Sequence, residues 1–256
     1  MKKLILSLVT LASLAFAANA VTFMRVHSSD GHIVMYDVKE VTEVDYEETE
    51  DGVTVSGKEG LYTYVDLGLP SGTKWATYNV GASKPTEYGD YFAWGETKPK
   101  EDYSWETYKW CNGSYTSMTK YCTRGYYGTV DNKTVLDAED DAATVNWGSA
   151  WRMPTAEEID ELLFGCSWEW VEDFNGTGIA GRLGTSKKNG TTIFLPAGHC
   201  IDLAVEYVYR GRYWSSSLYE NSSDCAHYLY FSDNSISSSN DIGSRYSGRS
   251  VRAVLR

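Results

Sequence analysis

The chain has 256 residues, and its 35 acidic and 23 basic side chains give a formal net charge of −12. This charge repels polyanions, which excludes nucleic acid or an anionic membrane surface as the main partner. Hydrophobic residues make up 42% of the sequence and aromatic residues 14%, so the composition is that of a folded domain and excludes intrinsic disorder.

The first twenty residues have the composition of a secretory signal peptide. Lys2 and Lys3 precede an apolar run over residues 4–17, and the tripeptide Ala-Asn-Ala that ends at Ala20 is a small-x-small cleavage pattern. The apolar run is too short to span a bilayer, and no other segment is long enough. We therefore expect a protein without a membrane span that is secreted, periplasmic or held at the cell surface after cleavage near Ala20.

Residues 21–58 predict a small N-terminal β unit followed by a linker. Apolar and polar side chains alternate on both sides of Asp30-Gly31, which is a hairpin signal. The acidic stretch 47–52 contains no apolar residue and is therefore interpreted as the linker. Residues 59–256 are expected to form the main domain.

The main domain is expected to be α+β, with short strands and two helices. Thr155 and Glu158 form a capping box before an apolar helix face that ends near Gly165. A shorter helix is expected over 138–144, and a long, loop-rich insertion over 98–133. Strands are expected over residues 63–69, 74–80, 191–195, 212–216, 226–231 and 249–255. Four tryptophans are expected in the core: Trp75, Trp94, Trp151 and Trp214.

Five cysteines lie beyond the signal peptide, so at least one has no partner within the chain. Cys111 and Cys122 flank a polar turn and are the natural local pair, but free, buried thiols are an equal alternative. No C-x-x-C occurs, which argues against a zinc knuckle or a thiol redox site.

The tail of the chain is rich in a few polar residue types. Residues 215–250 contain 13 Ser, 3 Asn, 3 Asp and 4 Tyr, and no lysine. Apolar residues recur among them in strand spacing, which a low-complexity linker would lack. Tyr, Ser and Asn are typical of adaptable binding surfaces, and many of these residue types are one or two adenine changes from an AAC codon, which favours a hypervariable surface.

Several motifs of the main domain resemble known families. Residues 151–158, Trp-Arg-Met-Pro-Thr-Ala-Glu-Glu, resemble a segment of C-type-lectin-like domains of the formylglycine-generating-enzyme subtype. Residues 213–217 and 250–252 look like the C-terminal part of that fold, and residues 65–76 and 88–96 are similar to the Fibrobacter succinogenes major paralogous domain family. This resemblance covers residues 61–256 and implies a C-type-lectin-like fold behind the N-terminal β unit.

The tail further resembles variable proteins of diversity-generating retroelements, in which a reverse transcriptase rewrites adenine positions of the gene. That resemblance implies a non-enzymatic protein that binds a protein or glycan ligand at a cell surface through residues 215–248, with the polar positions on one exposed face. The candidate ligand-binding residues are Tyr207, Tyr209, Tyr219, Asn221, Asp224, His227, Tyr228, Tyr230, Asp233, Asn234, Asn240, Asp241 and Tyr246.

Two other functions stay open at this point. One is an enzyme of the formylglycine-generating, sulfatase-modifying type, but the resemblance implies a cysteine pair near the C-terminus, and only Cys225 lies in that region. The other is a structural surface protein without a specific ligand. No cofactor is expected. A structural Ca²⁺ is an alternative, held by Asp224, Asp233 and Asp241 if their carboxylates converge.

Overall fold

Two compact units divide the chain between Tyr46 and Glu47. The computed structural model describes residues 23–27, 33–37, 48–50, 52–198, 209–237 and 241–255, with side chains from residue 52 onward. The expected signal peptide lies outside the described residues. In the first unit, β1 (Phe23–His27) and β2 (Ile33–Asp37) pair antiparallel. The two strands flank Asp30-Gly31, so the expected hairpin is confirmed in its strands.

The second unit begins earlier than the sequence indicated. Residues 48–50 form β3 (Glu48–Glu50), which pairs with β4 (Val53–Val55) where a linker was expected. The Thr54 backbone N–H donates to Thr192 Oγ1 at 3.2 Å, and the Thr192 N–H donates to Thr54 Oγ1 at 2.9 Å. These bonds join β4 to the main domain, so the boundary lies at residue 46 and not at 58.

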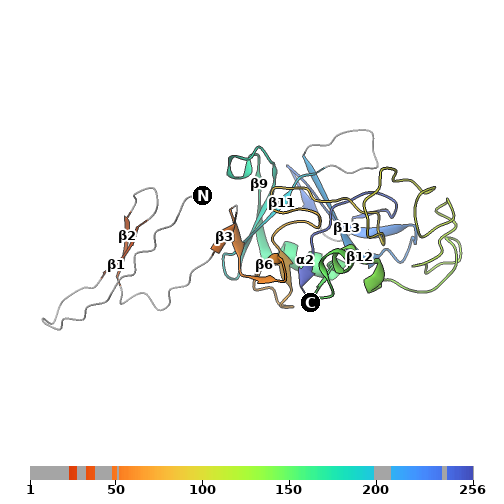
Figure 1. Cartoon of the computed structure of the whole chain (residues 1–256), viewed down its shortest axis with the longest axis horizontal. Helices are drawn as coiled ribbons and strands as arrows, with labels where there is room; N and C mark the ends of the chain where they lie inside the picture. The colour runs from red at the N-terminus through yellow and green to blue at the C-terminus, as the bar shows by residue number, and fades with distance from the viewer. Residues whose placement is uncertain are drawn as a thin grey trace, which may run out of the picture. The chain divides into compact units, whose positions relative to one another are not determined.

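The second unit is mostly β, with two short α-helices, which agrees with an α+β fold (Figure 1). One sheet has the order β5-β6-β7-β16-β8 and a second the order β11-β10-β9. The strands of the first sheet are β5 (Gly57–Glu59), β6 (Tyr62–Val65), β7 (Lys74–Ala76), β16 (Val254–Leu255) and β8 (Trp151–Arg152). Those of the second are β11 (Thr192–Pro196), β10 (Gly181–Ser186) and β9 (Cys166–Val171).

The third sheet carries the polar tail. Its order is β12-β13-β14, and β15 also pairs with β13. Its strands are β12 (Arg210–Leu218), β13 (Cys225–Ser232), β14 (Ile236–Ser237) and β15 (Ile242–Ser244). The strands expected over 212–216 and 226–231 are thus confirmed and are longer at both ends. The strand expected over 249–255 is reduced to β16, because residues 249–253 cross the core with only isolated bridges.

The two expected helices are present with corrected bounds. The capping box of α2 (Ala156–Gly165) is confirmed, because Thr155 Oγ1 accepts from the Glu158 N–H and Glu158 Oε2 accepts from the Thr155 N–H. The helix expected over 138–144 is interrupted. Asp141 is extended and caps α1 (Ala142–Trp147), so residues before it form only the 3₁₀ turn η1 (Ala138–Asp140). A second 3₁₀ turn is η2 (Phe174–Gly176).

The core is built around the four tryptophans that the sequence placed there. Trp75, Trp94, Trp151 and Trp214 are each at most 2% exposed. The expected insertion is also confirmed, because residues 77–137, all of which are described, contain no regular helix or strand. In Figure 1 this segment forms the yellow to green loops of the second unit.

Candidate functional site

The β12–β13 pair provides a rigid support for the polar tail. Tyr213, Trp214, Leu229 and Phe231 are buried on it, at 3% exposure or less. Trp214 Nε1 donates to the Phe92 carbonyl at 2.9 Å, which ties β12 to the segment after β7. We call the buried residues of β12 and β13 the C-terminal frame. Its packing removes a large apolar area from water and fixes the backbone of the turns between the strands.

The candidate residues do not share one face of this sheet, contrary to the expectation. Tyr228 lies opposite Trp214 and Tyr230 lies opposite Arg212 in the antiparallel register, so these side chains share one face. His227 belongs to the alternate positions and faces the other side. Successive side chains of a strand point to opposite faces, so a continuous run of polar residues is divided between the two faces of the sheet. The structure therefore separates the candidates into several groups.

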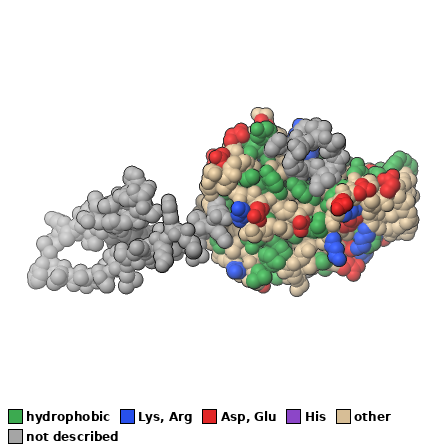
Figure 2. All heavy atoms as spheres, turned by 45° about the horizontal axis from the view of Figure 1, so that its top comes forward, with side chains coloured by type: hydrophobic (Ala, Val, Ile, Leu, Met, Phe, Trp, Pro, Cys, Tyr) green, Lys and Arg blue, Asp and Glu red, His purple; other side chains and the backbone are tan. Residues whose placement is uncertain are grey.

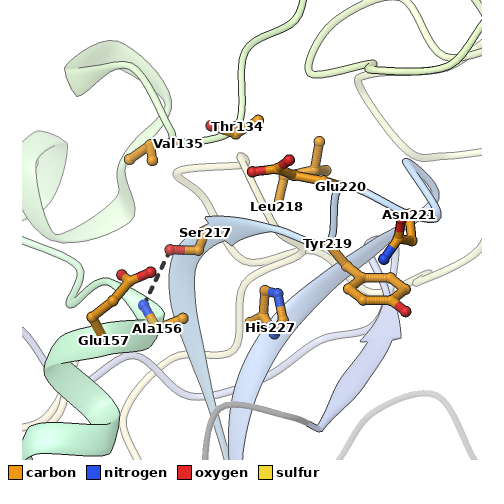
Figure 3. Close-up of a pocket in the computed structure, with 10 residues that line it drawn as sticks. All are labelled: Thr134, Val135, Ala156, Glu157, Ser217, Leu218, Tyr219, Glu220, Asn221 and His227. Atoms are coloured by element: carbon orange, nitrogen blue, oxygen red, sulfur yellow. Dashed lines mark hydrogen bonds between the residues drawn. The ribbon is translucent and has the colours of Figure 1, made fainter.

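The first group lines a pocket of about 320 Å³ between α2, the end of β12 and β13. We call it the His227 pocket. Its lining consists of Thr134 and Val135, Ala156 and Glu157, residues 217–221, and His227. Figure 3 shows the His227 imidazole between Glu157 on α2 and the ring of Tyr219, with Thr134 and Val135 across the hollow. Three sequence candidates meet here: Tyr219, Asn221 and His227.

The walls of this pocket are held by local hydrogen bonds. The Ala156 N–H, at the start of α2, donates to Ser217 Oγ at 3.1 Å. The Leu218 N–H donates to the Thr134 carbonyl at 2.7 Å, which fixes the insertion's end beside β12. The rings of Tyr219 and His227 meet edge to face, with centroids 5.5 Å apart. The pocket is therefore a preformed feature of three segments that are distant in the sequence.

The two adjacent acids of α2 have different environments. Glu158 is half-buried and binds the Arg152 guanidinium, with Arg152 Nη1 2.5 Å from its Oε2. Burial alone would raise the pKa of Glu158, but the hydrogen bonds from Arg152 and from the Thr155 backbone hold it below its usual value. Glu157 is exposed and turns toward the pocket (Figure 3). Glu158 is thus part of the fold, whereas the Glu157 carboxylate is available to a ligand.

The second group lies on the opposite face of β13. The Arg249 guanidinium sits 3.6 Å from the Tyr228 ring centroid and 4.2 Å from that of Trp214. Arg212 lies 5.7 Å from the Tyr230 ring. The Tyr228 N–H donates to the Asp241 carbonyl at 3.0 Å, and the Asp241 carboxylate accepts from Ser237. Tyr228 is thus partly structural, while Tyr230 and Asp241 remain half-exposed.

The third group surrounds the turn between β13 and β14. Asp233 and Asn234 are exposed, and so is Tyr209, at 54%. Arg182 Nη2 donates to the Ser232 and Asp233 carbonyls at 2.8 and 3.0 Å. The Tyr209 ring lies 6.2 Å from that of Trp170. Tyr207 and Asn240, two further candidates, lie outside the described residues.

The fourth group is in contact with the insertion. The Tyr246 ring is 4.8 Å from that of Trp105 and packs against a separate apolar cluster. Asp224 accepts a hydrogen bond from Ser222 Oγ at 2.6 Å, and Tyr127 shares a hydrogen bond with the same hydroxyl at 2.7 Å. Tyr246 therefore has a packing role that the sequence pattern did not reveal.

One buried arginine fixes the insertion to the C-terminal strands. Arg245 is fully buried, and its guanidinium donates to the carbonyls of Lys120, Tyr121 and Ser223 and to the Tyr108 hydroxyl, at 2.7 to 3.1 Å. Trp94 lies 4.8 Å from the same group. The cation is satisfied by oxygen acceptors and aromatic rings, without a carboxylate among these contacts.

The carboxylates proposed for Ca²⁺ do not converge. Among the described residues, the acids whose oxygens come within 4.8 Å of one another are Asp137, Glu139 and Asp140. Lys120 Nζ already lies 2.7 Å from Asp137 and 2.6 Å from Asp140, so the protein's own ammonium occupies that cluster. The alternative of a structural Ca²⁺ required Asp224, Asp233 and Asp241 to converge, and these three carboxylates do not form such a group.

The cysteines lack the pairing that the sequence allowed. Cys111 and Cys122 are free: Cys111 Sγ donates to the Trp105 carbonyl at 3.1 Å and Cys122 Sγ to the Arg124 carbonyl at 3.2 Å. Cys166 and Cys225 are free as well, and Cys200 lies outside the described residues. Burial raises the pKa of Cys225 to about 12, with the neighbouring Asp224 acting in the same direction.

The sequence interpretation missed several pocket residues, namely Thr134, Val135, Glu157, Ser217 and Glu220. Glu157 was not among the candidates. Adjacent helix residues point about 100° apart, so the capping box formed by Glu158 was a signal that Glu157 points elsewhere. The proximity of Thr134 and Val135 to β12 has no local signal in the sequence.

No protein-family model, curated protein or solved structure matches the chain. Within the described residues, no helix has both the length and the apolar character needed to cross a bilayer. Figure 2 shows small, separate groups of hydrophobic side chains among polar and acidic ones on the face that it draws.

Proposed function

We propose that the chain is an exported, non-enzymatic binding protein that recognises a protein or glycan ligand at a cell surface through its C-terminal turns. In this proposal the second unit is a C-type-lectin-like domain, and its tail is the target of a diversity-generating retroelement. The single observation that carries the proposal is the placement of polar and tyrosine side chains on the exposed turns of a buried frame. We call residues 219–224 and 233–235 the outer turns.

The outer turns have the properties of an adaptable recognition surface. Asn221, Asp233 and Asn234 are exposed, whereas Leu229 and Phe231 between them are buried. Substitution on the turns leaves the buried contacts in place, so side chains there can change at little cost in stability. The exposed tyrosine Tyr209 adds a rigid aromatic contact beside the second turn.

The formylglycine-generating alternative has less support. A nucleophilic or oxidisable cysteine needs a stabilised thiolate, and the raised pKa of Cys225 disfavours that form. Cys225 is the first residue of β13 and is a free thiol that is not paired with any described cysteine. These properties suit a small, half-buried packing side chain better than a reactive one.

The proposal is tested on a microarray of defined glycans and surface proteins. The wild-type chain is compared with a variant that carries Tyr209→Ala, Asn221→Ala, Asp233→Ala and Asn234→Ala. The matched control carries Lys58→Ala and Glu59→Ala on β5, which are also exposed. We expect the first variant to lose the array partners of the wild type and the control to keep them. Equal binding by both variants would overturn the proposal.

The retroelement part of the proposal has its own test in the gene. We expect a nearby reverse transcriptase gene and a near-copy of the 3′ end that differs from it at template adenines. The differences should fall on codons of the outer turns and spare those of the C-terminal frame. A gene without the near-copy would leave a binding protein with a fixed surface.

A further inference from the structure

The His227 pocket carries a negative charge that the protein does not neutralise. Among the described residues that line it, Glu157 and Glu220 are the acids, and none is a lysine or an arginine. Within the described residues, neither acid takes part in an ion pair, whereas the nearby acids Glu158, Asp137 and Asp140 all do. Two unpaired carboxylates from different elements face one hollow, in a chain that is acidic overall.

The basic residues next to the pocket have other partners. Arg124 is exposed, and it donates to Asn221 Oδ1 at 2.6 Å. Lys133 precedes Thr134 and binds Asp137 Oδ2 at 2.5 Å. The N-terminus of α2 has a partial positive charge, but two of its first N–H groups already have acceptors: the Ala156 N–H donates to Ser217 Oγ and the Glu158 N–H to Thr155 Oγ1. The pocket therefore keeps a net attraction for a cation.

We propose that the His227 pocket binds the side chain of a lysine presented by a partner protein. This inference rests on the proposed function, because it names the chemistry recognised at one of the outer turns. The ammonium group would lie between the carboxylates of Glu157 and Glu220, which Figure 3 shows on different sides of the hollow.

The shape and apolar part of the lining favour lysine over other cations. Val135, Leu218 and Ala156 offer contacts for a flexible alkyl stem, and a volume of about 320 Å³ accommodates such a side chain. An ammonium has three donors that point in different directions and can reach two carboxylates on separate elements. A guanidinium is planar and pairs best with both oxygens of one carboxylate, so this arrangement suits it less.

An aminosugar could offer the same ammonium, but the pocket suits it less. A sugar ring stacks on an open aromatic face, and the aromatic ring available here, that of Tyr219, is already engaged by His227. The experiment below therefore also measures the binding of glucosamine, for comparison with the lysine probe.

The test uses the full chain and follows the His227 imidazole by NMR, which is feasible because the sequence has only 4 histidines. The probe is Nα-acetyl-lysine methylamide, and the neutral control is the same compound acetylated at Nε. We expect the probe to shift the His227 signals in a saturable way and the acetylated control to leave them unchanged. Added salt should weaken the interaction, because the two carboxylates are exposed to solvent.

Matched variants locate the effect. Glu157→Gln and Glu220→Gln should each weaken the probe's binding about two- to fivefold, and the double variant about tenfold, as exposed ion pairs of this kind are weak. The control, Glu59→Gln with Glu106→Gln, removes the same charge at two exposed positions outside the pocket and should change the binding by less than about twofold. Cooperative thermal unfolding in all variants establishes that the fold is kept.

Three results would overturn the inference: equal shifts by the probe and its Nε-acetylated form, equal weakening by the control variant, or stronger binding of glucosamine than of the lysine probe. Each is distinct from failure of the proposed function. If the array partners are lost in the outer-turn variant while His227 does not respond to lysine, the pocket inference fails alone. If His227 responds while the array partners are kept, the surface proposal fails alone.

Discussion

The C-terminal frame and the outer turns are neighbours in the sequence, yet they meet opposite requirements. The frame holds Trp214, Leu229 and Phe231 out of water, while Asn221, Asp233 and Asn234 are exposed a few residues away. Gly211 lies opposite Phe231, and a Cβ there would come 2.0 Å from the ring, so even a methyl group is excluded from the frame. Composition alone therefore does not define a surface, because the same polar-rich segment contains both buried and exposed positions.

The greatest loss of stability is expected when the link between the frame and the insertion is removed. Arg245→Ala removes a buried guanidinium and leaves the carbonyls of Lys120, Tyr121 and Ser223 without their donor. We expect a loss of about 4 kcal/mol in the free energy of unfolding, measured with urea. Arg124→Ala, at an exposed arginine, is the control and should cost less than about 1 kcal/mol. A loss below about 1.5 kcal/mol for Arg245→Ala would contradict the structural role.

The next effect is a loss of stability at alkaline pH. Burial raises the pKa of Tyr213 to about 12, and it also raises that of Tyr108. The unfolded chain releases these protons from about pH 10, while the folded chain retains them, so stability is full below that pH and falls between about pH 10 and 12. We expect Tyr213 alone to account for about 2 kcal/mol of this loss. The part of the tyrosinate absorbance that comes from the buried tyrosines should appear only together with unfolding, and its full appearance while the chain is still folded would contradict the burial.

A third and smaller effect is a difference in stability between variants of the two adjacent acids of α2. Glu158→Gln loses the ion pair with Arg152 and should cost about 2 kcal/mol, because the half-buried guanidinium then lacks its counter-charge. Glu157→Gln should cost about 0.5 kcal/mol, from its favourable position near the helix N-terminus. Thermal or urea unfolding of both variants makes the comparison. Equal losses would mean that Glu157 is also part of the fold.

The smallest expected effect is on the outer turns themselves. Asn221→Ala, Asp233→Ala and Asn234→Ala should each change the free energy of unfolding by no more than about 0.5 kcal/mol, because their side chains are exposed. Phe231→Ala serves as the contrasting change in the frame and should cost about 4 kcal/mol. Losses of comparable size at the turns would remove the distinction between frame and surface.

The elements with a local signal were predicted from the sequence, and those that depend on distant segments were not. The capping box of Thr155 and Glu158 gave α2, and the spacing of apolar residues gave β12 and β13. By contrast, β9 and β10 were not expected. In β10, Gly181, Arg182 and Gly184 are buried through contacts with other strands, so its polar residues and glycines conceal the strand pattern.

The candidate site was predicted in part for the same reason. Residue types identified Tyr219, Asn221 and His227, which the structure brings to one pocket. The predicted strand over 226–231 already implied that His227 and Tyr228 face opposite sides of the sheet. The prediction nevertheless placed all polar positions of the tail on one exposed face. Glu220 and Val135 meet only because the insertion ends beside β12, and that contact depends on the whole fold.

The attachment of the insertion also has a consequence for the order in which the domain is made. Arg245 binds Tyr108 across 137 residues of sequence, and the insertion has no helix or strand of its own. A chain growing from its N-terminus therefore carries these loops without their central cation until nearly all of the domain has emerged. Contacts of such long range form slowly and all together. Protease resistance of residues 98–133 should consequently appear only after residue 245 leaves the ribosome, which makes this arginine a marker of completed synthesis.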